Sequence, residues 1–72
     1  STLLMEVCGK LLSEYQNERI LYVSGEESES QVAQRSKRLG VENKGFYIFN
    51  ETNWQKILEQ VKELKPKFLV LD

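Results

Sequence analysis

Two adjacent acids, Glu26 and Glu27, stand in the stretch YVSGEESES, just after an apolar run that ends at Gly25. A carboxylate held at a strand end by a glycine turn can accept a proton from an attacking water. Acids before a helix can instead interact with the positive end of the helix dipole, worth about 0.3 to 1 kcal/mol. Composition alone favours the dipole interpretation for both acids, and the catalytic interpretation stays open.

Asp72 presents a similar choice at the end of the apolar run KFLVLD. An aspartate in that place can terminate a strand or cap a following helix, and it is also where many nucleoside triphosphatases hold Mg²⁺. Two hydroxyl residues, Ser1 and Thr2, belong to the same edge if the first helix follows a strand outside this chain.

Other polar or reactive residues fit structural roles. We expect Asn50–Asn53 to form a turn and a helix cap, and Cys8 to be a small buried hydrophobe on an apolar helical stripe. Arg35, Lys37 and Arg38 are interpreted as a solvated helix end that suits the helix dipole.

Hydrophobic spacing predicts the elements that position these residues, in the order helix, strand, helix, strand, helix, strand. The expected helices run from Thr2 to Tyr15, from a Ser28 cap to a stop at Gly40, and from a Thr52 cap to Pro66; the expected strands are RILYVSG, GFYIF and KFLVLD. Capping boxes are predicted for Ser28 with Gln31 and for Thr52 with Gln55. Such alternation predicts an α/β fold with a parallel sheet and helices on both faces.

The apolar positions of each helix predict its buried side. The expected stripes are Leu3, Val7, Leu11 and Tyr15 beside Leu4, Cys8 and Leu12 in the first helix, Val32, Ala33 and Leu39 in the second, and Trp54, Ile57, Leu58, Val61 and Leu64 in the third.

Size and charge exclude several classes of function. The 72 residues make at most one small domain, and one cysteine with no histidine excludes a disulfide framework and a cysteine-based zinc site. Ten basic and eleven acidic side chains give a net charge of −1, so the chain has no electrostatic footprint for nucleic acid or an anionic membrane. No apolar run approaches the roughly 20 residues that span a bilayer, and we expect a cytoplasmic protein.

Four segments in order, LYVSGEES, RLG, ETN and ELKPKFLVLD, resemble the bacterial RadA (Sms) family of DNA-repair ATPases, and the resemblance covers the whole chain. It implies that residues 1–72 are part of a three-layer RecA-like ATPase domain, from the end of the phosphate loop to the second magnesium motif. Other RecA-like ATPases, such as ring helicases and clock-type ATPases, share the layout but fewer of these residues.

The resemblance also implies site roles, because STLL resembles the end of the family's phosphate loop running into a helix. Ser1 would coordinate Mg²⁺, Thr2 would contact a nucleotide phosphate, and Asp72 would organise the Mg²⁺. Glu26 would orient or deprotonate the water that attacks the γ-phosphate of ATP, whereas Glu27 has no assigned role beyond the helix start.

For the parent protein, the resemblance implies a hexameric, ATP-driven motor that binds single-stranded or branched DNA and promotes branch migration. The DNA contacts, a zinc module with four cysteines and the glycines and lysine of the phosphate loop would lie outside these residues, so we expect the fragment alone not to hydrolyse ATP. Two alternatives remain open at this point: another RecA-like ATPase, or a non-catalytic α/β interaction fragment.

Overall fold

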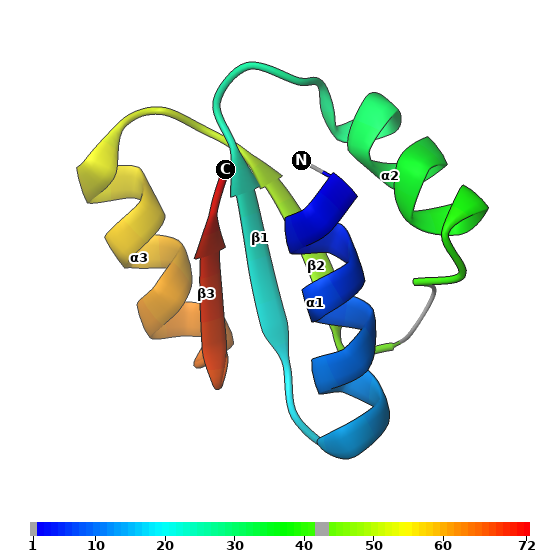
Figure 1. Cartoon of the computed structure of the whole chain (residues 1–72). Coiled ribbons are helices and arrows are strands. Elements are labelled where there is room, and N and C mark those ends of the chain that lie inside the picture. The colour runs from blue at the N-terminus through cyan, green and yellow to red at the C-terminus, as the bar shows by residue number, and fades with distance from the viewer. Residues whose placement is uncertain (1, 42–43) are drawn as a thin grey trace.

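The computed structural model describes residues 2–41 and 44–72 of the chain. Within these residues the elements alternate as predicted: α1 (Thr2–Glu14), β1 (Ile20–Ser24), α2 (Glu29–Arg38), β2 (Phe46–Asn50), α3 (Trp54–Leu64) and β3 (Phe68–Leu71). The described strands form one parallel sheet in the order β2–β1–β3 (Figure 1). The predicted α/β class is therefore confirmed, and the element ends differ from the predicted ones by one or two residues, as helix and strand ends commonly do.

The central strand β1 is buried along its whole length. Its side chains alternate between the two faces of the sheet. Ile20 and Tyr22 pack in a cluster with α1 and α2, whereas Leu21 and Val23 pack with Ile57 of α3. The chain therefore folds into three layers, with α1 and α2 on one face of the sheet and α3 on the other.

Helix α1 buries only one of the two stripes that were expected. Its buried residues are Met5, Cys8 and Leu12, whereas Leu3 and Val7 are 71% and 45% exposed. The prediction was right for Cys8 and Leu12 and wrong for Leu3, Val7 and Tyr15, because α1 carries apolar residues on adjacent stripes and periodicity alone does not choose between them. The prediction for Cys8 is confirmed, and burial raises the pKa of its thiol to about 11.

Helix α2 begins and ends as predicted. The Ser28 hydroxyl accepts from the Gln31 backbone N–H, the Gln31 side chain accepts from the Ser28 N–H, and Gly40 has the left-handed φ of 76° that suits a helix stop. Only part of the expected stripe is correct, because Val32 is buried while Ala33 and Leu39 are exposed.

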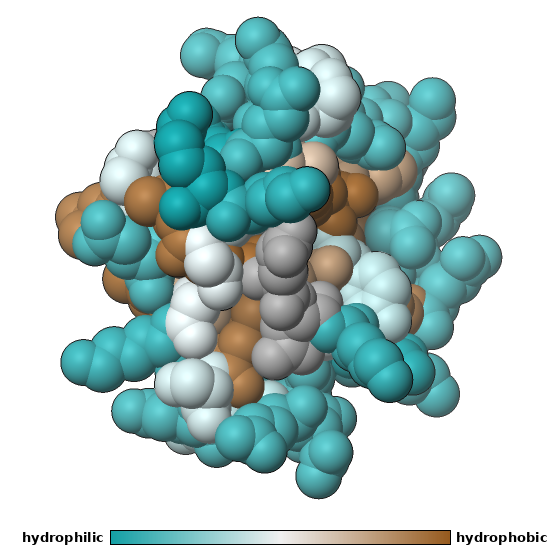
Figure 2. All heavy atoms as spheres, turned by 90° about the vertical axis from the view of Figure 1, so that its right-hand side faces the viewer, coloured by the Kyte–Doolittle hydropathy of each residue, from teal (hydrophilic) through white to brown (hydrophobic). Residues whose placement is uncertain are grey.

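The outer side of α2 faces solvent. Lys37 and Arg38 are exposed, as predicted. Figure 2 views the molecule from the side on which α2 lies and shows hydrophilic side chains over most of this face.

Helix α3 begins one residue later than expected. Asn53, not Thr52, is the N-cap: its Oδ1 accepts from the Lys56 backbone N–H at 3.2 Å. The Glu51 carboxylate accepts from the backbone N–H groups of Asn53 and Thr52, and these bonds lower the pKa of Glu51. Because Glu51 takes these N–H groups, the predicted capping box of Thr52 with Gln55 does not form.

The buried side of α3 is narrower than predicted. Ile57 is buried, whereas Trp54 and Leu58 are 53% and 41% exposed. The helix ends at Leu64, and Lys65 takes a left-handed conformation before Pro66. This agrees with the prediction that Pro66 ends the helix, since proline disfavours the α conformation in the residue before it. In the described part of the chain, no helix is both long and apolar enough to cross a membrane.

The approach of two loops at the amino edge of the sheet generates a stability prediction. The carbonyl of Gly45 accepts from the Ile20 N–H at 2.7 Å, and a Cβ on Gly45 would lie 2.3 Å from the Glu18 backbone oxygen. We expect Gly45→Ala to lower the free energy of unfolding by about 1 to 3 kcal/mol, because backbone must move to admit the methyl group. Urea unfolding of the purified protein measures this change.

Gly9→Ala is the matched control. A Cβ there would meet only the end of the Val41 side chain, at 3.1 Å, and alanine is favoured over glycine inside a helix by about 1 kcal/mol. We expect a smaller destabilisation than at Gly45, and equal losses at the two sites would contradict the structural explanation.

Candidate active site

The carboxyl ends of the parallel strands meet at one edge of the sheet, together with the N-terminal ends of the helices (Figure 1). The register pairs Ser24 with Asn50 and Val23 with Leu71, so that Asp72 follows directly at this edge. In open parallel α/β sheets, ligands bind beyond the carboxyl ends of the strands. This edge is therefore the place to look for a functional site.

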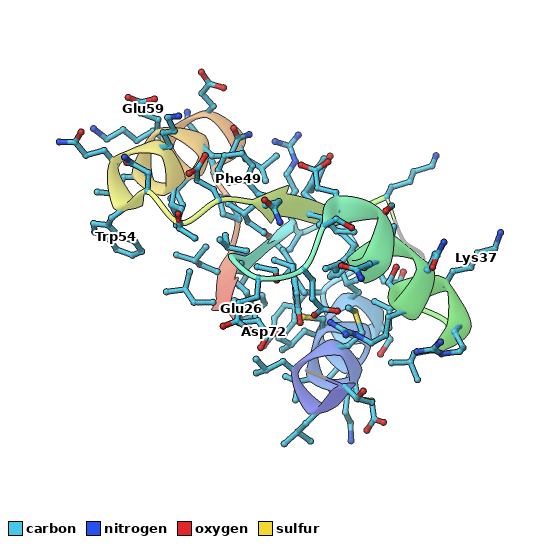
Figure 3. All side chains as sticks on the ribbon, turned by 90° about the horizontal axis from the view of Figure 1, so that it is seen from above. Glu26, Lys37, Phe49, Trp54, Glu59 and Asp72 are labelled. Carbon is cyan, nitrogen blue, oxygen red and sulfur yellow. The ribbon has the colours of Figure 1, made fainter. Side chains whose placement is uncertain are left out.

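Three of the residues predicted for the site lie at this edge. Thr2 is the first residue of α1, Glu26 lies in the loop between β1 and α2, and Asp72 follows β3. Figure 3 looks down on the edge and shows Glu26 and Asp72 there, while Lys37 lies on the outer side of α2. The fourth, Ser1, lies outside the described residues.

Asp72 connects the edge to the core. Its backbone N–H donates to the Val23 carbonyl at 2.9 Å, and its carboxylate accepts a hydrogen bond from the Tyr22 hydroxyl. The Tyr22 side chain is fully buried, and burial together with the bond to Asp72 raises its pKa to about 12. The tyrosine is therefore protonated at neutral pH and donates to the aspartate.

The chemistry of Asp72 fits a magnesium ligand. Mg²⁺ is commonly bound through one or two carboxylates together with substrate phosphates rather than by an all-protein cage. The Asp72 side chain is 21% exposed. Among residues 2–41 and 44–72, no group of three His, Cys, Asp or Glu side chains could hold a metal ion, so a site at Asp72 would depend on further ligands.

Glu27 and Arg35 form a two-pronged ion pair. Nη1 and Nη2 of Arg35 donate to the two carboxylate oxygens of Glu27 at 2.7 and 2.6 Å. These hydrogen bonds lower the pKa of Glu27 and raise that of Arg35. Nη2 of Arg35 also lies 4.0 Å from the carboxylate of Asp72.

This pair corrects two predictions. Arg35 is not part of a solvated helix end, because its side chain is only 15% exposed and is bound to Glu27. Glu27 is not simply a helix-start acid, because both of its oxygens accept from that arginine. The two residues are eight positions apart in the chain and meet because α2 lies against the loop that precedes it.

The backbone of Glu27 is also held. Its N–H donates to the hydroxyl of Ser24 at 3.3 Å, and its carbonyl accepts from the side-chain amide of Asn50. Asn50, predicted as a turn residue, is instead the last residue of β2 and joins that strand to the loop after β1. Asn53, the other asparagine, is the cap of α3, one residue after the cap that was predicted at Thr52.

A sequence signal for Arg35 was present. Val32 is buried on α2, and positions three and four residues later, Arg35 and Ser36, lie on the same helical face. A basic residue on a buried face needs an acidic partner. Tyr22 carried a weaker signal, because it alternates with Ile20 on the face that α1 and α2 cover.

The ion pair predicts how stability depends on pH. The pKa of Glu27 in the folded protein lies below its ordinary value of 4.5. The stabilisation by the charged form is therefore fully present above the unfolded-state pKa and is lost as the pH falls through the lower folded-state pKa. We expect Glu27→Gln to be less stable than the wild type at pH 7, with a difference that shrinks below pH 4.5.

Urea unfolding between neutral pH and about pH 3 checks this expectation. Glu29→Gln, which changes an exposed acid in the first turn of α2, is the control and should alter the free energy of unfolding by less than about 1 kcal/mol, the range of a helix-dipole interaction. A Glu27→Gln difference that stays constant over the whole pH range would rule out the ion pair as its source.

The amino-acid sequence was compared with those of known proteins and protein families. No protein-family model matches the chain. Over all 72 residues it is 43% identical to the DNA repair protein RadA of Aquifex aeolicus (strain VF5), of which it covers 16%. It is 44% identical to the RadA of Streptococcus pyogenes serotype M1 and 43% identical to that of Streptococcus pneumoniae (strain ATCC BAA-255 / R6), covering 15% and 16% of them.

The chain thus spans about 16% of the length of the relatives it matches. The resemblance to RadA that the motifs indicated is confirmed from one end of the chain to the other. The chain is a RadA-like sequence that matches one segment of those longer bacterial proteins.

Proposed function

We propose that this chain is part of the RecA-like ATPase core of a RadA-type DNA-repair protein. One observation carries the proposal: Thr2, Glu26 and Asp72 lie at the carboxyl edge of a parallel sheet in a chain that is 43% identical to a protein named DNA repair protein RadA. Residues 1–72 would extend from the end of the phosphate loop to the second magnesium motif.

The N-terminal end of α1 supplies the phosphate contacts in this proposal. Helix N-termini favour anions, because their free N–H groups and the helix dipole attract negative charge. Thr2 would contact a phosphate of ATP. The hydroxyl of Ser1 and the carboxylate of Asp72 would hold Mg²⁺, which when bound neutralises the negative charge that develops on the phosphates.

The two glutamates differ in their ability to act as a base. Both carboxylate oxygens of Glu27 accept from Arg35, and its pKa is lowered, so Glu27 is a weak base. Glu26 is exposed, and its side chain makes no hydrogen bond or ion pair with the other residues that the structure describes. Glu26 is therefore free to orient a water or accept its proton.

Asp72 remains a carboxylate in this scheme, and the buried Tyr22 hydroxyl holds it in place. A fixed carboxylate binds a metal at lower entropic cost than a mobile one, since less freedom is lost on binding. Tyr22 would therefore orient the metal ligand from within the core.

At the level of the whole protein, we propose an ATP-driven motor of DNA repair that binds single-stranded or branched DNA and promotes branch migration. The relatives carry the name DNA repair protein RadA, which supports the repair role. Because the net charge of these 72 residues is −1, the DNA contacts are assigned to other parts of the protein. A cytoplasmic homo-hexamer with a zinc module in a part of the protein outside these 72 residues completes the proposal.

Glu26→Gln in the full-length protein tests the catalytic assignment. Glutamine keeps the size of the side chain but cannot accept the proton. We therefore expect ATP turnover to fall by at least about 100-fold while nucleotide binding is retained. Steady-state ATPase assays and binding of a fluorescent ATP analogue measure the two properties. Glu29→Gln is the control, and wild-type turnover by Glu26→Gln would overturn the assignment.

Asp72→Asn tests the magnesium assignment. A neutral amide is a poorer Mg²⁺ ligand than a carboxylate, so we expect the full-length variant to need at least about tenfold more Mg²⁺ for half-maximal ATP turnover. The measurement is a Mg²⁺ titration of the ATPase rate, with Glu59→Gln on the exposed side of α3 as the control. An unchanged midpoint would remove Asp72 from the metal site.

A further inference from the structure

Glu27 is held from three different elements. The end of β1 contacts it through the Ser24 hydroxyl, the end of β2 through the Asn50 amide, and α2 through the guanidinium of Arg35. Its neighbour Glu26 has no such contact with the described residues. The position of Glu26 therefore depends on the backbone that Glu27 fixes.

We propose that Glu27 is a positioning residue for the reaction and that Arg35 acts as its clamp. The proposal rests on the catalytic role proposed for Glu26. The clamp fixes the loop between Gly25 and Ser28 against the ends of β1 and β2. It thereby holds the backbone of Glu26 at one place on the carboxyl edge without touching the substrate.

The geometry of Arg35 supports a clamp rather than a general surface ion pair. Two parallel hydrogen bonds to one carboxylate fix both distance and orientation, which a single lysine contact does not do. The same guanidinium lies 4.0 Å from the Asp72 carboxylate. Arg35 therefore fixes the position of the loop that carries Glu26 relative to Asp72, the residue proposed to hold the metal.

The energetics point in the same direction. Nε of Arg35 is buried and has no hydrogen-bond partner among the described residues. An unsatisfied buried donor is unfavourable, and a partly buried ion pair contributes little net stability compared with apolar packing. A contribution to folding stability therefore does not explain well why an arginine stands at position 35. A role in positioning Glu26 explains it better.

The test uses kcat and KM for ATP of the full-length protein in four variants: Glu27→Gln, Arg35→Gln, Arg35→Lys and the double variant Glu27→Gln with Arg35→Gln. A displaced catalytic group lowers the chemical rate more than substrate binding. We expect each Gln variant to lower kcat by about 10- to 100-fold, with KM changed by less than about threefold.

Two further results are expected if the residues act as a unit. The double variant should lose no more kcat than the worse single variant, because each change alone already breaks the clamp. Arg35→Lys should have a higher kcat than Arg35→Gln but a lower one than the wild type. Lysine keeps the positive charge but cannot make the two parallel hydrogen bonds to Glu27. If Arg35→Gln does not fold, as thermal unfolding will show, Arg35→Lys and the double variant, which leaves no unpaired charge, decide the question.

The outcomes separate this inference from the proposed function. Inactive Glu26→Gln together with wild-type kcat in Glu27→Gln and Arg35→Gln would overturn the clamp and leave the catalytic role of Glu26 in place. Loss of turnover in Glu27→Gln with full activity in Arg35→Gln would make Glu27 a reacting group and also overturn the clamp. Arg38→Gln, an exposed change on the same helix, is the control and should keep wild-type kcat.

Discussion

Burial of β1 on both faces is the constraint on which the rest of the structure depends. Covering both faces requires helices on each side of the sheet, and the connections from strand to helix to the next strand then make all strand pairs parallel. Parallel strands place all their carboxyl ends at one edge. Glu26 and Asp72 are 46 residues apart in sequence, yet the sheet brings both to this edge because the strands that they follow, β1 and β3, pair with each other.

The same strand also connects the core to the edge. Tyr22 is buried among the apolar side chains under α1 and α2, and its hydroxyl reaches the carboxylate of Asp72 at the end of the neighbouring strand. A buried hydroxyl needs a partner, and a carboxylate at a strand end accepts the bond. The packing of Tyr22 in the core therefore also sets the orientation of the Asp72 carboxylate. This explains how so small a sheet can hold a charged group in a fixed place.

The sequence predicted the features that depend on hydrophobic spacing and backbone conformation within one segment. It did not predict those for which two neighbouring residues or stripes are equally suitable and tertiary contacts decide between them. The alternating elements, the Ser28 capping box, the Gly40 stop and the burial of Cys8 followed from spacing and backbone chemistry. The choice between the two apolar stripes of α1 and the choice of Asn53 over Thr52 as the cap of α3 did not, because adjacent stripes and adjacent capping residues are locally equivalent. The positions of Thr2, Glu26 and Asp72 at one edge followed from topology, whereas the partner of Glu27 required the packing angle of α2.

The two adjacent glutamates show how one short loop can give identical side chains different chemistry. Successive residues in a turn point in different directions, so a single arginine on the next helix can bind one carboxylate and leave the other exposed. Binding lowers the pKa of Glu27 and occupies both of its oxygens, which makes it a poor proton acceptor. The dipole interpretation that composition favoured for both acids is thus incomplete for Glu27, which is held by a side chain of α2, whereas Glu26 is the exposed carboxylate of this loop.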